Sequence, residues 1–273
     1  MAIITIAREM ASLGEDIAEK LAGLTGYRVV DRAYIEKNLL GCGFKAAEQE
    51  KYDEKKPSFW SSLSDNWSAY IQYLKLVLYE EAEAGGCIIV GRGGSVVFRK
   101  VPNHLAVRVT APLSVRIERA MKLFSCDEQQ ARHLLEQSDH DRVGFSKIYF
   151  DSDWIDPRGY DITVNTAKLD ADQTARAIES CMTSVLREEV ETKGRSMVAN
   201  LSLGQKVLTE LICVKKVHLP NLTATANLGA VTLGGLSNTE AAIASAVAAA
   251  KAVPGVREVT SAIHLVQEYT VFP

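Results

Sequence analysis

The sequence predicts an α/β domain with a mainly parallel sheet between two layers of helices, followed by a small α+β domain. Short apolar runs alternate with stretches of helical periodicity along most of the chain, which is typical of a parallel sheet covered on both faces. After about residue 201 charged residues become sparse and the order of elements changes. A chain of 273 residues also exceeds the usual size of one domain. We therefore expect a first domain over residues 1–195 and a second over residues 201–268.

The chain opens with the pattern strand, loop, helix. Ile3–Ile6 forms a short apolar run, a polar turn follows through residues 11–14, and the next apolar residues recur at the spacing of a helix. A second apolar run, residues 28–30, ends immediately before Asp31 and Arg32. Because ligands of α/β proteins bind where the parallel strands end, these two polar residues are candidates for a binding site.

The same alternation continues through the rest of the first domain. Further strands are expected over residues 87–90, 105–109 and 161–166, and further helices begin at Tyr34, Tyr70, Gly94 and Pro112 or span residues 127–137 and 175–191. The charged run over residues 48–56 indicates an insertion that is mobile or faces a partner. Trp60 and Trp67 lie close to it and belong either to a partner surface or to local core.

A polar stretch over residues 192–196 is typical of a linker to the second domain. The elements expected beyond it are a helix over residues 205–211, strands over 222–227 and 230–234, a helix over 240–252 and a strand over 259–266. Small residues at Ala244, Ala248 and Ala252 would let the second helix lie close to the sheet. This order predicts a compact α+β fold.

Composition excludes several classes of protein. Hydrophobic residues at 47% and charged residues at 24% are typical of a globular protein, and the net charge of −3 lacks the basic excess of a dedicated nucleic-acid binder. Five widely spaced cysteines without a CxxC motif, and histidines without metal-site spacing, indicate neither a disulfide framework nor a zinc site. No export signal or membrane span is expected, since the apolar stretch over residues 241–253 is shorter than the roughly 20 residues that a span needs. We expect a cytoplasmic protein.

The loop after the first strand occupies the position of a phosphate-binding loop. A strong match reads GxxxxGK followed by Ser or Thr, because glycines let backbone amides wrap the phosphate and the lysine neutralises its charge. Here Glu15 stands in the place of the cation and Asp16 in the place of the hydroxyl residue. Two carboxylates in the first turn of a helix also stabilise it by roughly 0.3–1 kcal/mol each, which is the simpler explanation of their presence.

Six segments resemble, in order and spacing, the cytidylate kinase-like family. They are IAREMASLGEDIAEKLA, YRVVDRAYIEK, IIVGRGGSVVF, VRVTAPLSVRIERAM, SDHDR and YDITVNTAKL, and they extend from Ile3 to about Leu169. The resemblance implies a three-layer P-loop core, a nucleoside monophosphate site and an arginine-bearing lid. It also implies transfer of a phosphoryl group from ATP, with Mg²⁺, to a pyrimidine nucleoside monophosphate such as CMP or dCMP.

The resemblance assigns roles to residues near the strand ends. Ser12 and Gly14 would lie at the donor phosphates, and Asp31 and Arg32 would face the acceptor nucleotide. Arg92 would hold the acceptor phosphate, because its planar fork offers bidentate hydrogen bonds to phosphate oxygens.

Further arginines follow on the helices. Arg116 and Arg119 lie three positions apart and share a helix face, so they would approach the ATP phosphates or pair with carboxylates such as Glu118. The lid would comprise Asp139, Asp141, Arg142 and Lys147. Arg142 would close over the transferring phosphoryl group and exclude water, with a plain surface loop as the alternative. Arg92 and Arg142 are therefore the expected catalytic residues.

Departures from the family pattern bear on activity. The loop of the family usually reads GSGG followed by a base, whereas here Ala11 and Leu13 replace glycines and Glu15 replaces the base. A side chain at position 13 would obstruct the loop. Two unit charges about 4 Å apart interact by roughly 4 kcal/mol at an effective dielectric constant near 20, so the reversed charge would slow transfer by decades. Magnesium held by Glu15 or Asp16 would offset part of this effect.

The segment from about Leu201 to Gln267 resembles a BON domain, through its Gly229 turn, its alanine-rich helix and its Pro254-Gly255 turn. Such domains are associated with ligand, lipid-surface or partner binding, and the sparse charge favours regulation or assembly here.

Three hypotheses on function follow. The chain is an ATP-dependent kinase of CMP or dCMP, a catalytically impaired sensor of a nucleotide or another anion, or an assembly protein whose small domain binds a protein partner or sets a homo-oligomer.

Overall fold

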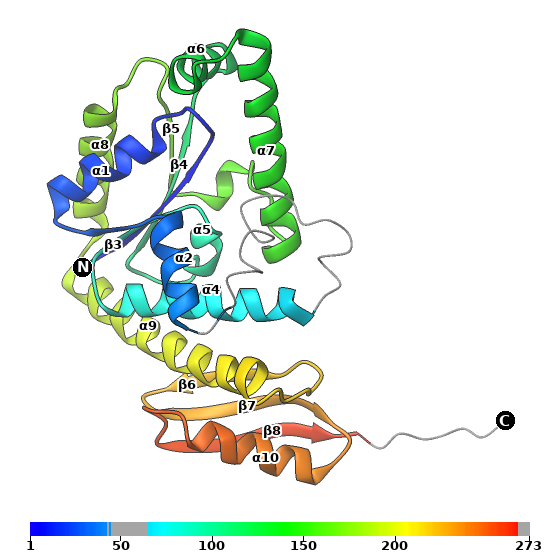
Figure 1. Ribbon diagram of the computed structural model, residues 1–273. Helices are drawn as coiled ribbons and strands as arrows, with labels where there is room; N and C mark the ends of the chain where they lie inside the picture. Colours follow the sequence, from blue (N-terminus) through cyan, green and yellow to red (C-terminus); the bar gives the residue numbers. More distant parts are fainter. Residues whose placement is uncertain (43, 45–64, 267–273) are drawn as a thin grey trace. The chain divides into compact units, whose positions relative to one another are not determined.

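The computed structural model describes residues 1–42, 44 and 65–266 (Figure 1). Contacts divide the chain into a first unit, Met1–Trp67 with Ala84–Gly194, and a second unit, Ser68–Glu83 with Arg195–Pro273. The charged run over residues 48–56, Trp60 and the side chain of Trp67 lie outside the described part of the chain. Each unit is a separate body and is described by itself.

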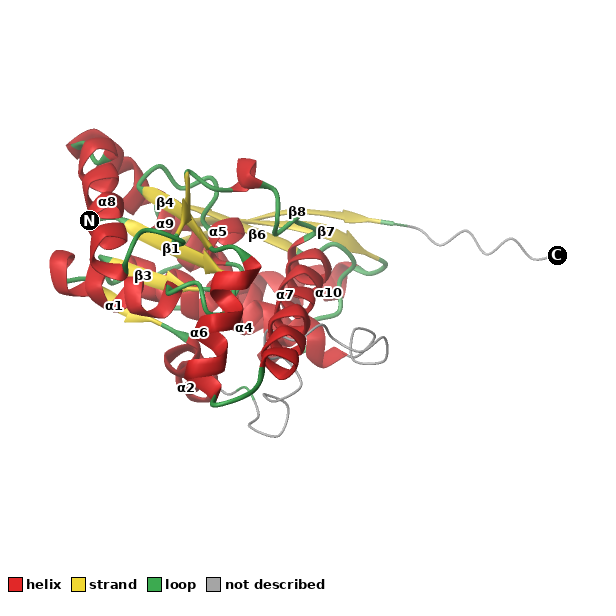
Figure 2. Cartoon of the chain, turned by 90° about the horizontal axis from the view of Figure 1, so that it is seen from above, coloured by secondary structure: helices red, strands yellow, loops and turns green. Residues whose placement is uncertain are grey.

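The first unit contains the parallel sheet that the sequence predicts. Its five strands are β1 (Ile3–Arg8), β2 (Arg28–Val30), β3 (Cys87–Val90), β4 (His104–Thr110) and β5 (Ile162–Asn165), in the order β2-β3-β1-β4-β5. All neighbours are parallel, and Ile6 is in register with Val90 on one side and with Val107 on the other. Figure 2 shows β1 and β3 pointing the same way. The carboxyl ends of the strands therefore meet at one edge.

Helices cover both faces of this sheet. They are α1 (Gly14–Thr25), α2 (Arg32–Gly41), α5 (Gly94–Val97), α6 (Leu113–Phe124), α7 (Glu128–Phe150) and α8 (Ala171–Val185), with a short 3-10 helix at Pro157–Gly159. On one face, Ile17 of α1 and Ile178 of α8 are fully buried in the core with Ile6. On the other face α5 lies so close that a Cβ on Gly94 would come within 3.0 Å of Thr5. The predicted α/β class is confirmed.

The segment expected to form a lid loop is helical. Helix α7 begins with a capping box of Asp127 and Gln130 and continues to Phe150, so Ser138–Arg142 lies in its middle rather than after its end. The helix ends where Asp151 adopts a left-handed conformation with φ of 46°. The expected helix over residues 127–137 is confirmed but continues to Phe150, so the alternative of a plain surface loop at Ser138–Arg142 is wrong. Buried Phe145 and Tyr149, one helical turn apart, continue the apolar face of the helix well beyond the predicted end at residue 137.

The second unit contains a smaller, mixed sheet. Its strands β6 (Thr223–Asn227), β7 (Ala230–Ser237) and β8 (Glu258–Leu265) lie in sequence order, with β6 antiparallel and β8 parallel to β7. Its helices are α4 (Asp65–Glu83), α9 (Glu188–Thr209) with a π-helical continuation at Glu210–Val214, and α10 (Glu240–Lys251). The predicted small α+β domain is confirmed, and its core contains Val207, Leu211, Val231, Leu233 and Ile263.

Two local expectations in this region need correction. The alanines that pack are Ala246 and Ala250, both fully buried, whereas Ala244, Ala248 and Ala252 are exposed. The stretch over residues 192–196 does join the two units, whose boundary follows Gly194, but it is helical and part of α9. Gly194 does not break the helix; it lies against Asn103 so closely that an added Cβ would overlap the Asn103 side chain.

Helix α4 belongs to the second unit although it precedes β3 in the chain. The side-chain amide of Gln205 on α9 donates to the side-chain oxygen of Gln72 at 2.7 Å and to its carbonyl at 3.1 Å. Lys206 lies 3.5 Å from Glu80 and 3.7 Å from Glu83. The predicted first domain, residues 1–195, thus includes a helix whose polar partners lie in the second unit.

The stretch Glu188–Val214 is long and apolar enough to cross a membrane by length and composition alone, with a mean hydropathy of 1.2 and 44% of its most apolar window buried. Val207 and Leu211 of this stretch are fully buried in the core of the second unit. Core packing therefore explains its apolar composition.

The half-buried His104 makes the stability of the first unit depend on pH. His104 Nε2 lies 2.8 Å from Thr5 Oγ1, and burial lowers the pKa of His104 to about 4, against the opposing charge of Asp161. The unfolded chain takes up a proton near pH 6.5 while the folded chain does not, so stability falls as the pH drops from 6.5 towards 4. We expect a loss of about 2 kcal/mol between pH 7.5 and 5.0, measured by hydrogen exchange of β1 and β4 in urea. His104→Gln should remove most of this loss, and the exposed His133→Gln should not.

The close approach of α9 to β6 depends on one glycine. A Cβ on Gly204 would lie 2.8 Å from the carbonyl oxygen of Ala224, which is backbone and cannot rotate away. Gly204→Ala should destabilise the second unit by about 1–3 kcal/mol in urea unfolding. Gly23→Ala is the matched control, because nothing lies within 4 Å of an added Cβ there and alanine favours the helix. Equal effects of the two substitutions would contradict this packing.

Candidate functional site

The candidate site lies at the edge where the parallel strands of the first unit end. Arg8 is the last residue of β1, Asp31 follows β2, and Arg92 follows β3 after one glycine. Parallel strands with short connections bring these three side chains to one edge although they are far apart in the sequence. This edge is where α/β proteins bind ligands.

The loop between β1 and α1 has left-handed backbone at two residues that are not glycine. Ala11 and Leu13 adopt left-handed conformations, with φ of 60° and 70°, which cost roughly 1–2 kcal/mol each for residues other than glycine. The Leu13 side chain packs against the main core of the unit, and Ala11 packs against a small cluster around Ile117. Leu13 is thus half-buried against the core, and the expected obstruction of the loop stays a prediction.

Hydrogen bonds turn the carbonyl groups of this loop towards the protein. The Ser12 hydroxyl is fully buried and donates to the carbonyls of Glu9 at 2.8 Å and Val109 at 3.2 Å. The Thr166 hydroxyl donates to the Ser12 carbonyl at 3.0 Å, and Arg119 donates to the Ala11 carbonyl at 3.4 Å. The Ser12 amide is itself taken by the Glu9 carbonyl at 3.3 Å, so the start of α1 is the part of this segment suited to an incoming anion.

Arg116 and Arg119 support the loop from behind. Arg116 binds Asp139 in a bidentate manner, at 2.8 and 3.2 Å, and lies 3.5 Å from Glu9. Arg119 donates to the carbonyl of Thr166 at 2.7 Å. Their role at the ATP phosphates stays a prediction, and the carboxylates that Arg116 contacts are Asp139 and Glu9 rather than the expected Glu118.

Glu9 joins the loop to the neighbouring strand and helix, and sequence reasoning missed it. Its carboxylate is nearly buried and accepts from the Thr110 hydroxyl at 2.5 Å, the Ala111 amide at 3.2 Å and Arg108 at 3.3 Å. The Arg108 guanidinium lies over the ring of Trp154, 4.5 Å from its centre. The signal in the sequence was an acidic residue directly after a buried strand.

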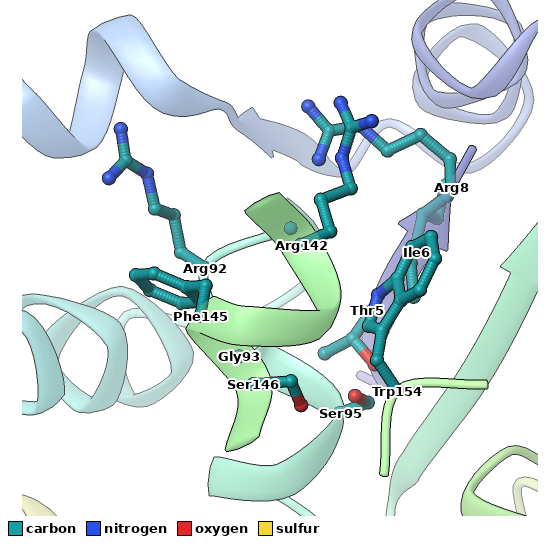
Figure 3. Close-up of a pocket in the computed structure, with 12 residues that line it drawn as sticks. Thr5, Ile6, Arg8, Arg92, Gly93, Ser95, Arg142, Phe145, Ser146 and Trp154 are labelled. Carbon is teal, nitrogen blue, oxygen red and sulfur yellow. The ribbon is translucent and has the colours of Figure 1, made fainter. Parts of the chain in front are cut away.

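Three arginines line one hollow at the strand ends. Figure 3 shows Arg8, Arg92 and Arg142, with the guanidinium groups of Arg8 and Arg142 pointing toward one another. The other labelled residues of the wall are Thr5, Ile6, Gly93, Ser95, Phe145, Ser146 and Trp154. The enclosed volume is about 30 Å³, room for roughly two water molecules. Side chains must therefore move before a phosphate can enter.

Each of these arginines already has a partner. Arg8 Nε donates to Glu15 at 2.8 Å, and Arg92 donates to Glu36 at 3.1 Å. Arg142 donates to the hydroxyl of Ser138, one helical turn earlier on α7. An anion that enters the hollow would therefore have to displace these partners from the arginines.

A second, larger hollow adjoins the first. It has a volume of about 460 Å³ and is lined by Arg8, Glu15, Ala18, Glu19, Val29, Asp31, Arg32, Ala33, Glu36 and Val90. Asp31 caps α2 by accepting the amide of Tyr34 at 2.8 Å, and Arg32 donates to Glu36 at 2.7 Å. The two residues predicted to face the acceptor nucleotide therefore do lie in one hollow.

The remaining predicted residues lie apart from the two hollows. Lys147 is exposed on α7 and pairs with Asp151, which raises the pKa of the lysine and lowers that of the aspartate. Asp141 accepts from Gln137 at 2.9 Å on the same helix. Gly14 lies under the stem of Arg8, where an added Cβ would come within 2.5 Å. The roles predicted for these residues stay predictions.

Among the described residues, no group of three or more histidine, cysteine or acidic side chains could hold a metal ion. The oxygen donors beside the loop are the exposed carboxylates of Glu15 and Asp16 in the first turn of α1. A magnesium ion would therefore have to arrive with phosphate ligands, as Mg²⁺ usually does in nucleotide sites.

Two family models match this chain. Residues 3–168 match the model of the cytidylate kinase-like family, and residues 202–267 match that of the BON domain. A cytidylate kinase from Methanopyrus kandleri is 26% identical over 118 residues, 40% of this chain. The match spans 61% of that curated relative, less than two thirds of its length.

A solved structure shares the fold of about two thirds of this chain. An uncharacterized protein from Eubacterium ventriosum matches with a TM-score of 0.54 and 22% identity, over 67% of this chain and 99% of that one. A shikimate kinase from Bacteroides thetaiotaomicron matches with a TM-score of 0.41 and 13% identity, over 67% and 98% of the two chains.

The network around Glu9 predicts a large stability effect. Glu9→Ala leaves two nearly buried arginines without their shared carboxylate, and removing one partner of such a group costs about 3–5 kcal/mol. Urea unfolding of the full chain measures this loss. The exposed Glu118→Ala, on the same helix as Arg116, is the control and should change stability by less than about 0.5 kcal/mol. Similar losses for the two variants would show that Glu9 is not central.

Proposed function

Because the chain belongs to the cytidylate kinase-like family, we propose that its first unit transfers the γ-phosphoryl group of ATP to CMP or dCMP, with Mg²⁺. The observation that carries this proposal is the hollow lined by Arg8, Arg92 and Arg142 at the strand ends. Phosphoryl transfer needs little covalent chemistry from the protein, and positioning with charge neutralisation supplies most of the catalysis. Three arginines from two strands and a helix suit that task.

The larger hollow suits the acceptor nucleotide, and the arginine hollow suits its phosphate and the phosphoryl group that is transferred. Asp31 and Arg32 in the larger hollow would contact the acceptor nucleotide, whose phosphate would reach Arg92. Arg92 follows a short strand and is nearly fully buried, so its fork is held in place by the fold. Arg142 on α7 would neutralise the phosphoryl group in transit. Exclusion of water by Phe145 and Trp154 would limit hydrolysis of ATP.

Of the two carboxylates beside the loop, one is suited to hold Mg²⁺. Asp16 offers an exposed carboxylate beside the loop, and carboxylates with phosphate oxygens are the ligands that Mg²⁺ prefers. Glu15 is less suited because it pairs with Arg8. When bound with ATP, the ion would neutralise charge on the phosphate oxygens.

A second candidate function is a sensor of nucleotides or other anions without turnover. The Arg8–Glu15 pair and the small enclosed volume favour it, since both oppose entry of a phosphate. Replacing Glu15 by Lys or Arg separates the two candidates. ATP binding that appears only in the variant favours a lost site, whereas weaker binding places Glu15 in the working site.

The proposal predicts binding and turnover together. Titration calorimetry with ATP, CMP and dCMP, each with and without Mg²⁺, should show binding of a donor and an acceptor, and the same sample should release ADP when both are present. Binding without ADP would favour the sensor. Absence of binding would contradict both candidates.

Arg92→Ala tests the acceptor site. Loss of a buried bidentate contact to phosphate should raise the KM for CMP by at least about tenfold with a smaller change for ATP. Arg158→Ala is the control, because Arg158 is exposed and pairs with Asp156 away from both hollows. An unchanged KM for the acceptor would reject this role.

A further inference from the structure

We propose that Arg8 is a phosphoryl-binding residue of this site and that Glu15 positions its guanidinium. This inference rests on the proposed function, which it deepens by naming a cation that the sequence motif does not identify. The predicted phosphate contacts were Ser12, Gly14, Arg116 and Arg119. The geometry points instead to the last residue of β1.

Arg8 stands where the two hollows meet. Of the described residues that line the arginine hollow and the larger hollow beside it, Arg8 is common to both. It ends a strand that is buried along its whole length, and it is itself only 8% exposed. An acceptor nucleotide that lies in the larger hollow and has its phosphate on Arg92 in the other hollow would therefore pass Arg8, at the end where the phosphoryl group arrives.

The guanidinium of Arg8 converges with that of Arg142. Figure 3 shows the two groups pointing toward one another at the upper edge of the hollow, one from β1 and one from α7. Like charges held side by side repel, and an anion placed between them converts the repulsion into two attractions. The planar forks of two arginines also match the oxygens of a phosphoryl group, which each can bind in a bidentate manner.

Glu15 holds Arg8 in a way that is compatible with ligand binding. The carboxylate contacts Nε, at 2.8 Å, and the guanidinium carries its other donors on the two terminal nitrogens, which form the fork. The Glu15 side chain is 64% exposed, so water screens its charge, whereas Glu36 beside Arg92 is 28% exposed and Glu9 beside Arg116 is 14% exposed. Of these three carboxylates, Glu15 is the most exposed and the one that can move most readily when an anion approaches the arginine.

The aliphatic part of the Arg8 side chain lies against Gly14, which has no side chain to block it. A Cβ at position 14 would lie 2.5 Å from both Cβ and Cγ of Arg8, so any side chain there would push the arginine out of place. Gly14 under the stem and Glu15 at Nε thus fix the direction of the guanidinium from two consecutive residues of α1. The carboxylate that departs from a phosphate-loop motif acquires a positioning role.

The test uses the full chain and the variants Arg8→Ala, Arg8→Lys, Glu15→Ala and Glu15→Gln. ATP binding with Mg²⁺ is measured by calorimetry, and ADP release with CMP is measured at steady state. We expect Arg8→Ala to weaken ATP binding at least tenfold and to lower kcat about a hundredfold. Arg8→Lys, which keeps the stem and the charge and is less prone to unfold, should recover binding more than kcat. Arg158→Ala is the control and should match the parent chain.

The positioning role of Glu15 is tested by comparing the kcat of two variants, because a purely structural role would not distinguish them. Glu15→Gln retains an acceptor for Arg8 Nε, whereas Glu15→Ala does not, so a positioning role predicts that Gln restores most of the kcat that Ala loses. Equal losses for both variants, or a higher Mg²⁺ requirement for both, would overturn that role in favour of charge or metal binding.

The outcomes separate this inference from the proposed function. A parent chain that neither binds ATP nor releases ADP overturns both. A parent chain that works, with Arg8→Ala unchanged and Arg92→Ala impaired, overturns the role of Arg8 alone. If the parent binds ATP without turnover, the calorimetric result decides: weaker binding by Arg8→Ala supports the role, and equal binding overturns it.

Discussion

The carboxylate of Glu9 is the interaction on which the candidate site depends. It draws together Arg108 of β4, the start of the segment leading to α6, and Arg116 of α6, and all of these partners lie about a hundred residues further along the chain. Because the network is nearly buried, each member needs the others to avoid an unpaired charge in a region of low dielectric. The loop that follows Glu9 can hold strained conformations at Ala11 and Leu13 because its base is fixed in this way.

This arrangement explains how a loop without the usual glycines keeps its form. Glycine permits left-handed conformations at no steric cost, and the chain here accepts that cost and offsets it by packing. Half-buried Leu13 packs against the main core, and half-buried Ala11 packs against the cluster beside α6. Arg119 and Thr166 donate to the loop carbonyls. These surrounding contacts therefore hold the loop in a backbone conformation that its own residues disfavour.

The sequence predicts the sheet well, because its strands are short apolar runs buried on both faces, as in β1 and β3. The sequence predicts poorly which face of a helix is buried when the residues on all faces are similar. Helix α10 is so rich in alanine that Ala244 and Ala246 are equivalent in the sequence, and only the sheet beneath selects which one is buried. Gly194 illustrates the same limit, since a glycine that breaks a helix and one that admits a neighbour such as Asn103 look identical in the chain.

The site was predictable where a residue follows directly from a strand, as for Asp31, Arg32 and Arg92. It was not predictable where the role arises from partners distant in sequence, as for Glu9, or where a single residue faces two hollows, as for Arg8. Arg116 and Arg119 were singled out correctly as a shared helix face, but the sequence did not reveal that this face meets the loop and α7.

The placement of α4 has a consequence for the order in which the protein is made. Gln72 of this helix bonds to Gln205, 133 residues later, so its partner does not exist when α4 leaves the ribosome. At a synthesis rate of about 5–20 residues per second, the helix waits roughly 7–27 s. During that interval its large apolar residues, among them Tyr70, Leu74 and Leu78, lack the partner helix of their own unit. The second unit is thus not formed by the C-terminal part of the chain alone. A chain shortened before α9 would still contain α4 but would lack the helix that α4 bonds to.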